Sequence, residues 1–465
     1  PALITLWNSF KYQQYRNCDH LINASDEWSK PVMTTIWNDF RNRQYEWCTR
    51  LTSAWTESSS NTITKIWDCF RYYQYSWCTS LVNAAVENIA YSNWCKIWSL
   101  FRAREYDWCT ALRYAAAEVM PQWIISIYYW FRRWQYYWCT SLLESPDEVF
   151  PSWVTQWSKS DFRREQYYWC TSLTTAWDED ICPSVVSWND IILSTWFRTQ
   201  QYYWCTSLLY APDEVCPNDI TKTYWSYSDW SSYRDRQYEW CTALRTAARE
   251  AISSNLETLW TYFRYYQYKG CTSLTTPATE VMPNTVTTLS KDASYWYCCF
   301  RNGQYYWCTS LTTAAAEVMS PNITWEIWDH FRALQYYGCT SLTTAAPIEV
   351  IPNWVTVLWT NFRTSQYANC SSLLVAPDEV MPNTVVTVKS QFRYWQYANC
   401  TSLTTAWDEA FSSSCTGCWF YFRYRQYGDC TDLISAWREA FSDSVTYISD
   451  HFRYSQYSNC TSLTT

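Results

Sequence analysis

One unit of about thirty residues recurs fifteen times along the 465-residue chain, and this repeat constrains the fold more than any other feature. Each copy reads Phe-Arg-x-x-Gln-Tyr-x-x-Cys-Thr-Ser-Leu, followed by a Glu and by an apolar run that leads to the next Phe. In the second copy these positions include Phe40, Cys48, Leu51 and Glu57. A unit of this size cannot bury an apolar face alone, so neighbouring copies must stack into a shared core. The sequence therefore predicts one continuous solenoid over residues 1–465.

The spacing inside the unit separates its core from its surface. Phe and Glu are seventeen residues apart in every link but one, where an extra residue precedes Glu349. The three longest copies instead lengthen the segment between Pro and the next Phe, for example from Pro283 to Phe300. Insertions are tolerated on surface connections and not in packed segments. The block from Phe to Glu is therefore the predicted core.

A known family shares part of this pattern. Cys271-Thr-Ser-Leu-Thr-Thr, followed by Pro283-Asn-Thr-Val-Thr, resembles the BspA-like class of leucine-rich repeats on microbial surface proteins. The resemblance covers the whole chain, although the unit here is longer and carries an additional Arg-x-x-Gln-Tyr before the Cys. It implies an α/β repeat solenoid of about fifteen right-handed coils. Each coil would contain one short strand from Leu-Thr-Thr and a turn or short helix through Phe-Arg-x-x-Gln-Tyr.

Helical spacing supports the short helix. Trp37, Phe40, Gln44 and Cys48 follow one another at steps of three or four residues. A rival interpretation extends the helix to Glu57 and yields an array of helical hairpins. Thr-Ser-Leu-Thr-Thr makes a poor helix interior because it is rich in β-branched and hydroxyl residues. A strand with a short helix is the favoured prediction.

Five positions of the unit predict ladders of identical side chains, represented by Arg41, Gln44, Tyr45, Cys48 and Glu57. Two rows of like charge would repel, so we expect each Arg to pair with a Glu of the same or an adjacent coil. The alternative is that both charged groups face water. The Gln row suggests stacked amides, and the Tyr row is expected in the core.

The cysteines allow several interpretations. The repeated Cys is expected to be a small buried apolar residue with a weak donor, with disulfides along the ladder as the alternative. Cys415-Thr-Gly-Cys418 is an isolated pair that suggests either a redox pair or half a zinc site. Cys298 and Cys299 lie in the longest insertion and are interpreted as incidental. The prediction is that the protein binds no metal.

The residue before each repeated Cys predicts a left-handed backbone or turn. It is Gly, Asn or Asp in seven copies and Trp in the other eight. Because the turn faces outward, we expect these tryptophans to point into solvent with few contacts, the alternative being that they pack on the outer face. The sequence also offers five N-glycosylation sequons, three of them at this turn. Their asparagines are Asn23, Asn322, Asn369, Asn399 and Asn459.

Composition excludes several function classes. The net charge of −8 disfavours binding to a nucleic-acid backbone, and no apolar run is long enough to span a membrane. The three histidines, His20, His330 and His451, form no catalytic constellation, and no phosphate-binding loop is present. The protein is therefore expected to be no enzyme and to need no cofactor.

Neither terminus has a polar capping unit, so we expect an uncapped segment of a longer array.

Three function classes remain. The first is an extracellular structural or adhesive glycoprotein, expected to be a fibre or filament subunit whose partners are copies of itself or a multivalent cell surface. The second is a leucine-rich-repeat solenoid that recognises a protein or glycan. The third is an ice- or surface-binding array, which would need a regular row of Thr; Ala111, Arg113 and Asp432 interrupt that row. We rank the three in this order.

Overall fold

A computed structural model gives the structure of the chain. It describes residues 5–6, 8–24, 34–54, 57–85, 87–115, 118–120, 123–146, 148–149, 153–157, 161–176, 179–180, 191–192, 196–215, 220–222, 232–248, 250–251, 254–259, 262–278, 280–289, 300–315, 317–323, 325–345, 348–406, 411–436 and 443–464. The chain divides into two compact units. Unit 1 is Pro1–Ile220 with Trp240–Thr242, and unit 2 is Thr221–Glu239 with Ala243–Thr465. The single continuous solenoid and its right-handed sense stay predictions.

Short parallel strands begin at or beside the repeated Glu. They are β3 (Glu57–Ile66), β4 (Glu87–Ile97), β5 (Glu118–Val119), β7 (Glu148–Val149), β9 (Glu179–Asp180), β11 (Glu214–Val215), β13 (Glu250–Ala251), β15 (Glu280–Val281), β17 (Glu317–Val318), β19 (Ile348–Val350) and β21 (Asp378–Val380). Equivalent residues pair across coils, as Glu57 does with Glu87 and Glu349 with Glu379. The backbone of the Glu ladder is therefore in register.

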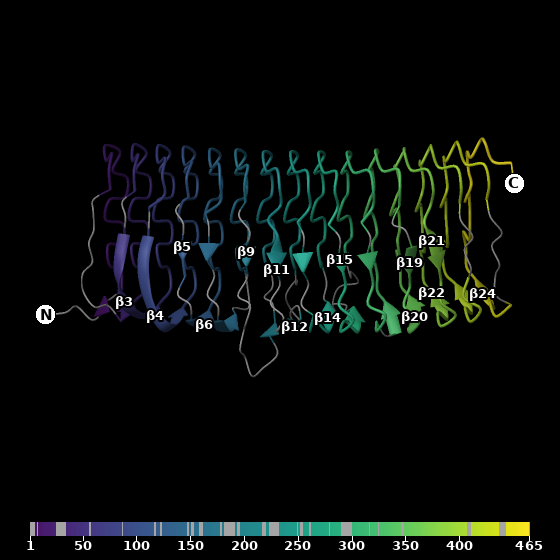
Figure 1. The fold of residues 1–465 in the computed structure, drawn as a ribbon, viewed down its shortest axis with the longest axis horizontal. Coiled ribbons are helices and arrows are strands. Elements are labelled where there is room, and N and C mark those ends of the chain that lie inside the picture. Colours follow the sequence, from purple (N-terminus) through teal and green to yellow (C-terminus); the bar gives the residue numbers. More distant parts are fainter. Residues whose placement is uncertain are drawn as a thin grey trace. The chain divides into compact units, whose positions relative to one another are not determined.

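A second set of strands uses the apolar run before Phe. It comprises β1 (Thr5–Leu6), β2 (Thr35–Ile36), β6 (Trp123–Ile127), β8 (Trp153–Trp157), β10 (Ile191–Ile192), β12 (Ile220–Lys222), β14 (Thr258–Leu259), β16 (Thr288–Leu289), β18 (Trp325–Ile327), β20 (Val355–Leu358), β22 (Thr387–Val388), β23 (Gly417–Cys418) and β24 (Tyr447–Ile448). In unit 1 the sheet order is β1-β2-β3-β4-β6-β8, and in unit 2 one sheet runs β18-β20-β22-β23-β24 (Figure 1). All these pairings are parallel, as stacked coils require.

Among the described residues, the Leu-Thr-Thr stretch, predicted as the strand, pairs through isolated single-residue bridges. Isolated parallel bridges join Asn23 to Ser53 and Ser53 to Asn83 in unit 1, and Thr344 to Val375 in unit 2. The prediction placed the strand in the wrong segment. The sheets form instead at Glu and in the aliphatic run.

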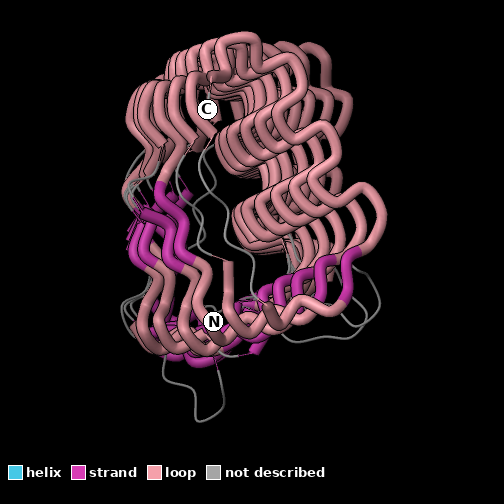
Figure 2. The backbone as a smooth tube through the Cα atoms, turned by 90° about the vertical axis from the view of Figure 1, so that its right-hand side faces the viewer, coloured by secondary structure: helices cyan, strands magenta, loops and turns pink. Residues whose placement is uncertain are grey.

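Of the turn or short helix predicted through Phe-Arg-x-x-Gln-Tyr, the turn is confirmed, and the favoured short helix is wrong, since the described part of the chain contains no helix (Figure 2). The segment from the residue before Phe to the residue before Cys, for example 39–47, is here named the turn ribbon. In its first part every second residue has a left-handed backbone, with φ of 60° at Asp39, 53° at Arg41 and 56° at Arg43. The rival array of helical hairpins is excluded for the described residues on the same ground.

Hydrogen bonding explains why the turn ribbon replaces a helix. The amides of Asn42 and Gln44 donate back three residues, to the carbonyls of Asp39 and Arg41, which closes successive turns. The amides of Arg43 and Tyr45 donate across the stack to the next coil, at 2.9 and 2.8 Å. A helix would keep all of these bonds within one coil. Each left-handed non-glycine residue costs roughly 1–2 kcal/mol, which the links between coils must offset.

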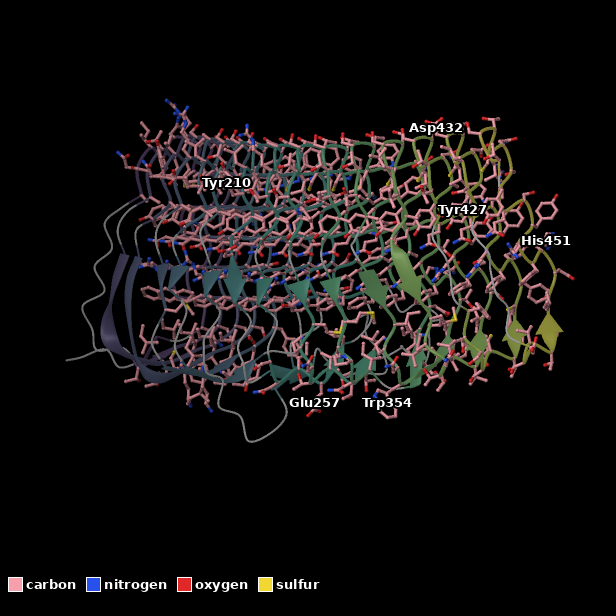
Figure 3. The ribbon with its side chains drawn as sticks, turned by 45° about the vertical axis from the view of Figure 1, so that its right-hand side comes forward. Tyr210, Glu257, Trp354, Tyr427, Asp432 and His451 are labelled. Carbon is pink, nitrogen blue, oxygen red and sulfur yellow. The ribbon has the colours of Figure 1, made fainter. Side chains whose placement is uncertain are left out.

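The core agrees with the predicted block. Phe40, Tyr45, Cys48 and Leu51 are buried, as are their equivalents through most of each unit. Their rings lie face to face between neighbouring coils, with centroids 5.3 Å apart for Phe40 and Phe70 and 5.2 Å for Tyr45 and Tyr75. Figure 3 shows these side chains as rows of repeated rings, one of which contains Tyr427.

Candidate functional site

The glutamines of the turn ribbon form a directional row of hydrogen bonds inside each unit. Nε2 of Gln74 donates to Oε1 of Gln44 at 3.3 Å, and Nε2 of Gln366 donates to Oε1 of Gln335 at 3.2 Å. These side chains are fully buried. Because each amide is both donor and acceptor, a coil that carries Gln offers an acceptor to the following coil and a donor to the preceding one. The row gives the stack a chemical direction.

The arginine one residue after each Phe is also buried. Arg41 is 3% exposed, and Arg132 and Arg363 are 0% exposed, so these are not solvated surface residues. In most coils the guanidinium lies near the aromatic ring just before it in sequence, 5.1 Å from the Phe40 centroid for Arg41. The predicted partner, Glu57, has its backbone in β3, but its side chain lies outside the described part of the structure. The pairing of Arg41 with Glu57 therefore stays a prediction.

The repeated cysteines are free thiols that bind to backbone. Sγ of Cys48 donates to the carbonyl oxygen of Tyr15 at 2.8 Å, and Sγ of Cys400 donates to that of Tyr367 at 3.1 Å. Burial raises the pKa of Cys48 to about 11 and that of Cys400 to about 12. The thiols are therefore neutral donors, and the alternative of disulfides along the ladder does not fit these bonds. Cys298 and Cys299 lie outside the described residues.

The position before each repeated Cys is left-handed, as Trp47 (φ 66°) and Asn369 (φ 62°) illustrate. In unit 1 its tryptophans form one continuous stack, with successive centroids 4.5–4.8 Å apart until a tilted last pair at 5.8 Å. The stack contains Trp47, Trp77, Trp108, Trp138, Trp169, Trp204 and Trp240. The expectation that these indoles point into solvent with few contacts is therefore wrong for this stack. They pack against one another on the outer face, with Trp47 exposed and the other six half-buried.

In unit 2 the same position holds Gly, Asn or Asp, with Trp307 as the one exception. Nδ2 of Asn399 donates to Oδ1 of Asn369 at 2.9 Å, and Nδ2 of Asn459 donates to Oδ1 of Asp429 at 2.6 Å. Asn369 and Asn399 are half-buried, whereas Asn459 is exposed. The three sequon asparagines of this turn therefore belong to a polar row along the coil edge.

The two other sequons lie on different parts of the coils. Asn23 is exposed, and its Oδ1 accepts a hydrogen bond from the Ser53 hydroxyl at 2.9 Å. Asn322 is also exposed, and its Nδ2 donates to the carbonyl of Asn284 at 2.8 Å. Both asparagines are accessible from solvent.

A further row went unnoticed in the sequence. The position three residues after Phe carries Arg43, Tyr73, Arg104, Trp134 and Glu165 in successive copies of unit 1. The Arg104 guanidinium lies 5.4 Å from the Tyr73 centroid and 4.0 Å from the Trp134 ring, and Nε1 of Trp134 donates to Glu165. Alternation of cations and aromatic rings at one repeat position was the available signal.

Asp107 joins this row from within its coil. Its Oδ2 lies 3.1 Å from Nη1 of Arg104, and the residue is almost fully buried. Burial raises the pKa of Asp107 to about 7, even though the Arg104 charge acts in the opposite direction. Asp107 therefore places a carboxyl with a raised pKa beside Arg104 of this row.

Candidate metal ligands and histidines are the remaining chemical groups of the described residues. They contain no group of three or more His, Cys, Asp or Glu side chains placed to hold a metal ion. Burial lowers the pKa of His330 to about 4, and its Nε2 lies 3.1 Å from Nδ2 of Asn361. His20 and His451 lie at exposed positions.

Within the described ranges, no helix reaches the length and hydropathy that a membrane crossing requires.

Comparison with known proteins concerns the architecture. No family model matches the chain, and no curated protein matches its sequence. One similar solved structure is a leucine-rich repeat protein from Bacteroides ovatus ATCC 8483, with 15% identity, a TM-score of 0.42, and coverage of 93% of this chain and 92% of that one. Another is a leucine rich cell surface protein from Faecalibacterium prausnitzii A2-165, with 14% identity, a TM-score of 0.30, and coverage of 96% and 86%. The chain is a β-solenoid with repeats of about thirty residues that is similar to bacterial leucine-rich repeat proteins.

Proposed function

We propose that this protein is a non-enzymatic structural or adhesive solenoid that works outside a cell, as a subunit of a fibre or filament. The observation that carries the proposal is the complementarity between the two faces of a coil. Gln366 donates to Gln335 on one side and accepts from Gln396 on the other, while the Tyr367 ring stacks on Tyr336 and Tyr397. A coil from another copy of the chain would offer the same donors, acceptors and rings.

Such a surface favours partners that are themselves repetitive. Copies of the chain, or a multivalent cell surface, would meet many equal and individually weak contacts. Contacts of this kind add up to strong attachment without any single tight site.

Self-association can be tested at Gln14. This side chain is exposed, and its Oε1 accepts a hydrogen bond from Nε2 of Gln44. Gln14→Glu keeps that acceptor but removes the amide donor and adds a charge at an exposed coil face. Gln13→Glu makes the same charge change beside the ladder and serves as the matched control.

Sedimentation velocity over a range of concentrations, with electron microscopy, measures the outcome. We expect the unaltered chain and Gln13→Glu to form assemblies that lengthen with concentration, and Gln14→Glu to need at least tenfold more protein. A chain that stays monomeric up to its solubility limit would contradict the fibre. Equal assembly of all three proteins would contradict the role of the amide ladder.

The extracellular compartment predicts N-linked glycans. A secretory eukaryotic host offers the test, with mass spectrometry before and after enzymatic deglycosylation. We expect occupancy first at the exposed Asn23, Asn322 and Asn459, because Asn369 and Asn399 are half-buried. The Asn→Gln variants at these positions identify the occupied sites, and an unmodified secreted chain would contradict the glycoprotein.

A second candidate function is recognition of a protein or glycan. The bridge positions of unit 1 are varied, and two of them are large exposed aromatics, Tyr114 at 52% and Tyr210 at 56% exposure. Figure 3 labels Tyr210. A binding solenoid would need such a varied face. Binding to a glycan array that is lost in Tyr114→Ala with Tyr210→Ala, but kept in Thr344→Ala with Thr405→Ala, would favour this alternative over the fibre.

A further inference from the structure

Cys415 and Cys418 replace an aliphatic pair that other coils of unit 2 carry at the same two positions. Cys418 pairs in register with Val388 of the preceding coil, and Cys415 closes the same tight turn as Val385. The amide of Cys415 donates to the carbonyl of Ser412 at 3.2 Å, as the amide of Val385 does to Pro382 at 3.1 Å. Both thiols therefore take core positions of the coil.

The two thiols lie close together inside this core. Both residues are 0% exposed, and each thiol affects the pKa of the other. Sγ of Cys415 lies 3.6 Å from the carbonyl oxygen of Gly417, which sits between them in sequence. The interaction with Cys418 lowers the pKa of Cys415, whereas the interaction with Cys415 and burial raise that of Cys418.

This arrangement differs from that of the repeated cysteines. In coils on either side, Cys400 and Cys430 direct their sulfur atoms to the carbonyls of Tyr367 and Tyr397. Each repeated thiol is thus occupied by a backbone acceptor of the preceding coil. A disulfide within one coil requires a second thiol beside the first, and Cys415 has Cys418 as that neighbour.

Zinc binding is the alternative role for Cys415 and Cys418. Structural zinc requires four ligands, usually Cys and His. No group of three candidate ligands forms anywhere among the described residues, so the pair lacks the remaining partners there.

We propose that Cys415 and Cys418 form an intrachain disulfide when the chain folds in the presence of a low-molecular-weight disulfide. The thiolate of Cys415 attacks one sulfur of the small disulfide, releasing one small thiol and leaving a mixed disulfide. The thiolate of Cys418 then attacks the Cys415 sulfur and releases the second small thiol. The protein pair loses two electrons and two protons, and the small disulfide is reduced to two thiols.

The test is cell-free synthesis of the full chain in glutathione buffers that range from reduced to oxidised. Remaining thiols are then alkylated in denaturant, and the peptides are mapped by mass spectrometry. We expect the oxidised buffer to yield the peptide of residues 415–418 without alkyl groups and about 2 Da lighter than its dithiol form. The whole chain would carry two fewer alkyl groups than its 23 cysteines allow.

Two variants provide matched controls. Cys415→Val with Cys418→Val restores the aliphatic pair of the neighbouring coil, and we expect it to fold and to carry an alkyl group on every remaining cysteine. Cys95→Ile removes another buried cysteine of the apolar run, which pairs with Ile124 in the neighbouring coil. It should leave the 415–418 result unchanged. Complete alkylation of Cys415 and Cys418 in every buffer, or disulfides confined to other cysteines, would overturn the proposal.

Discussion

Nε of Arg102 lies 2.7 Å from Oε2 of Glu105, and both side chains are buried in the same coil. Glu105 stands where the other fourteen copies carry Gln, and it still accepts a hydrogen bond from Nε2 of Gln135 at 3.3 Å. In the last copy Nε of Arg453 donates to Oε1 of Gln456 at 2.6 Å. The arginine can therefore bind the ladder residue three positions later, and Arg102 compensates the one carboxylate in the row.

Removal of Arg102 tests this compensation. Arg102→Leu leaves the Glu105 carboxylate buried without its cation, and we expect the free energy of unfolding to fall by about 3–5 kcal/mol. Glu105→Gln restores the amide and should change it by less than about 1 kcal/mol. Urea denaturation of both variants and of the double variant measures the coupling. An Arg102→Leu cost that is the same in the Glu105→Gln background would contradict the ion pair as its cause.

Gly338 provides space for Trp307. The glycine has φ of 73°, and a Cβ atom on it would lie 2.5 Å from Cδ1 of the Trp307 ring in the preceding coil. We expect Gly338→Ala to destabilise unit 2 by about 1–3 kcal/mol through overpacking. Trp307→Ala should remove most of this penalty in a double-mutant cycle followed by thermal unfolding. Additive losses would show that the left-handed backbone, and not the ring, sets the cost.

Asp107 makes stability depend on pH. Its pKa is about 7 in the folded protein against an ordinary value of 3.8, so between these values the folded state holds a proton that the unfolded state lacks. Stability should therefore fall as pH rises from about 4 to about 7, by a few kcal/mol at most. Asp107→Ser, which copies the buried Ser76 of the preceding coil, should flatten this part of the curve. Urea denaturation across this pH range provides the measurement, and an unchanged slope in the variant would assign the dependence to other groups.

The tryptophan stack of unit 1 should have an optical signature. Parallel indoles at 4.6 Å couple their transitions, so we expect an exciton couplet in the far-ultraviolet circular dichroism spectrum. Trp108→Asn interrupts the stack with a residue that tolerates the left-handed backbone, and it should reduce the couplet and cost about 1–3 kcal/mol. Trp307→Asn is the matched control, because Gly270 and Gly338 flank Trp307 in the neighbouring copies. Equal spectral changes in both variants would contradict coupling along the stack.

The repeat period made the burial pattern predictable. Phe40, Tyr45, Cys48 and Leu51 recur at constant spacing, and identical side chains at constant spacing must lie above one another once the coils stack. The amide row follows from the same register, since a column of glutamines can satisfy its own donors and acceptors. The left-handed position before Cys was visible because seven of the fifteen copies carry Gly, Asn or Asp there.

The same repeat pattern could not distinguish a short helix from a series of turns. Trp37, Phe40, Gln44 and Cys48 have helical spacing, yet that spacing also suits a ribbon of successive turns whose inner side chains face the core. The row of Arg104, Trp134 and Glu165 was equally hidden, because unlike residues at one position look like random variation. Only their contacts across coils show that a cation, an aromatic ring and a carboxylate interact.

The sequence by itself determined that equal units stack, in which register they stack, and which side chains form the core, because all three follow from a fixed repeat length. The tertiary structure decided the backbone between those side chains. An isolated Phe-Arg-x-x-Gln-Tyr segment would satisfy its amides locally, and a left-handed arginine would only cost energy there. In the stack, Arg43 and Tyr45 gain acceptors that belong to the next coil, about thirty residues away in sequence. Those hydrogen bonds exist only between coils, so the choice of turns over a helix belongs to the assembled solenoid.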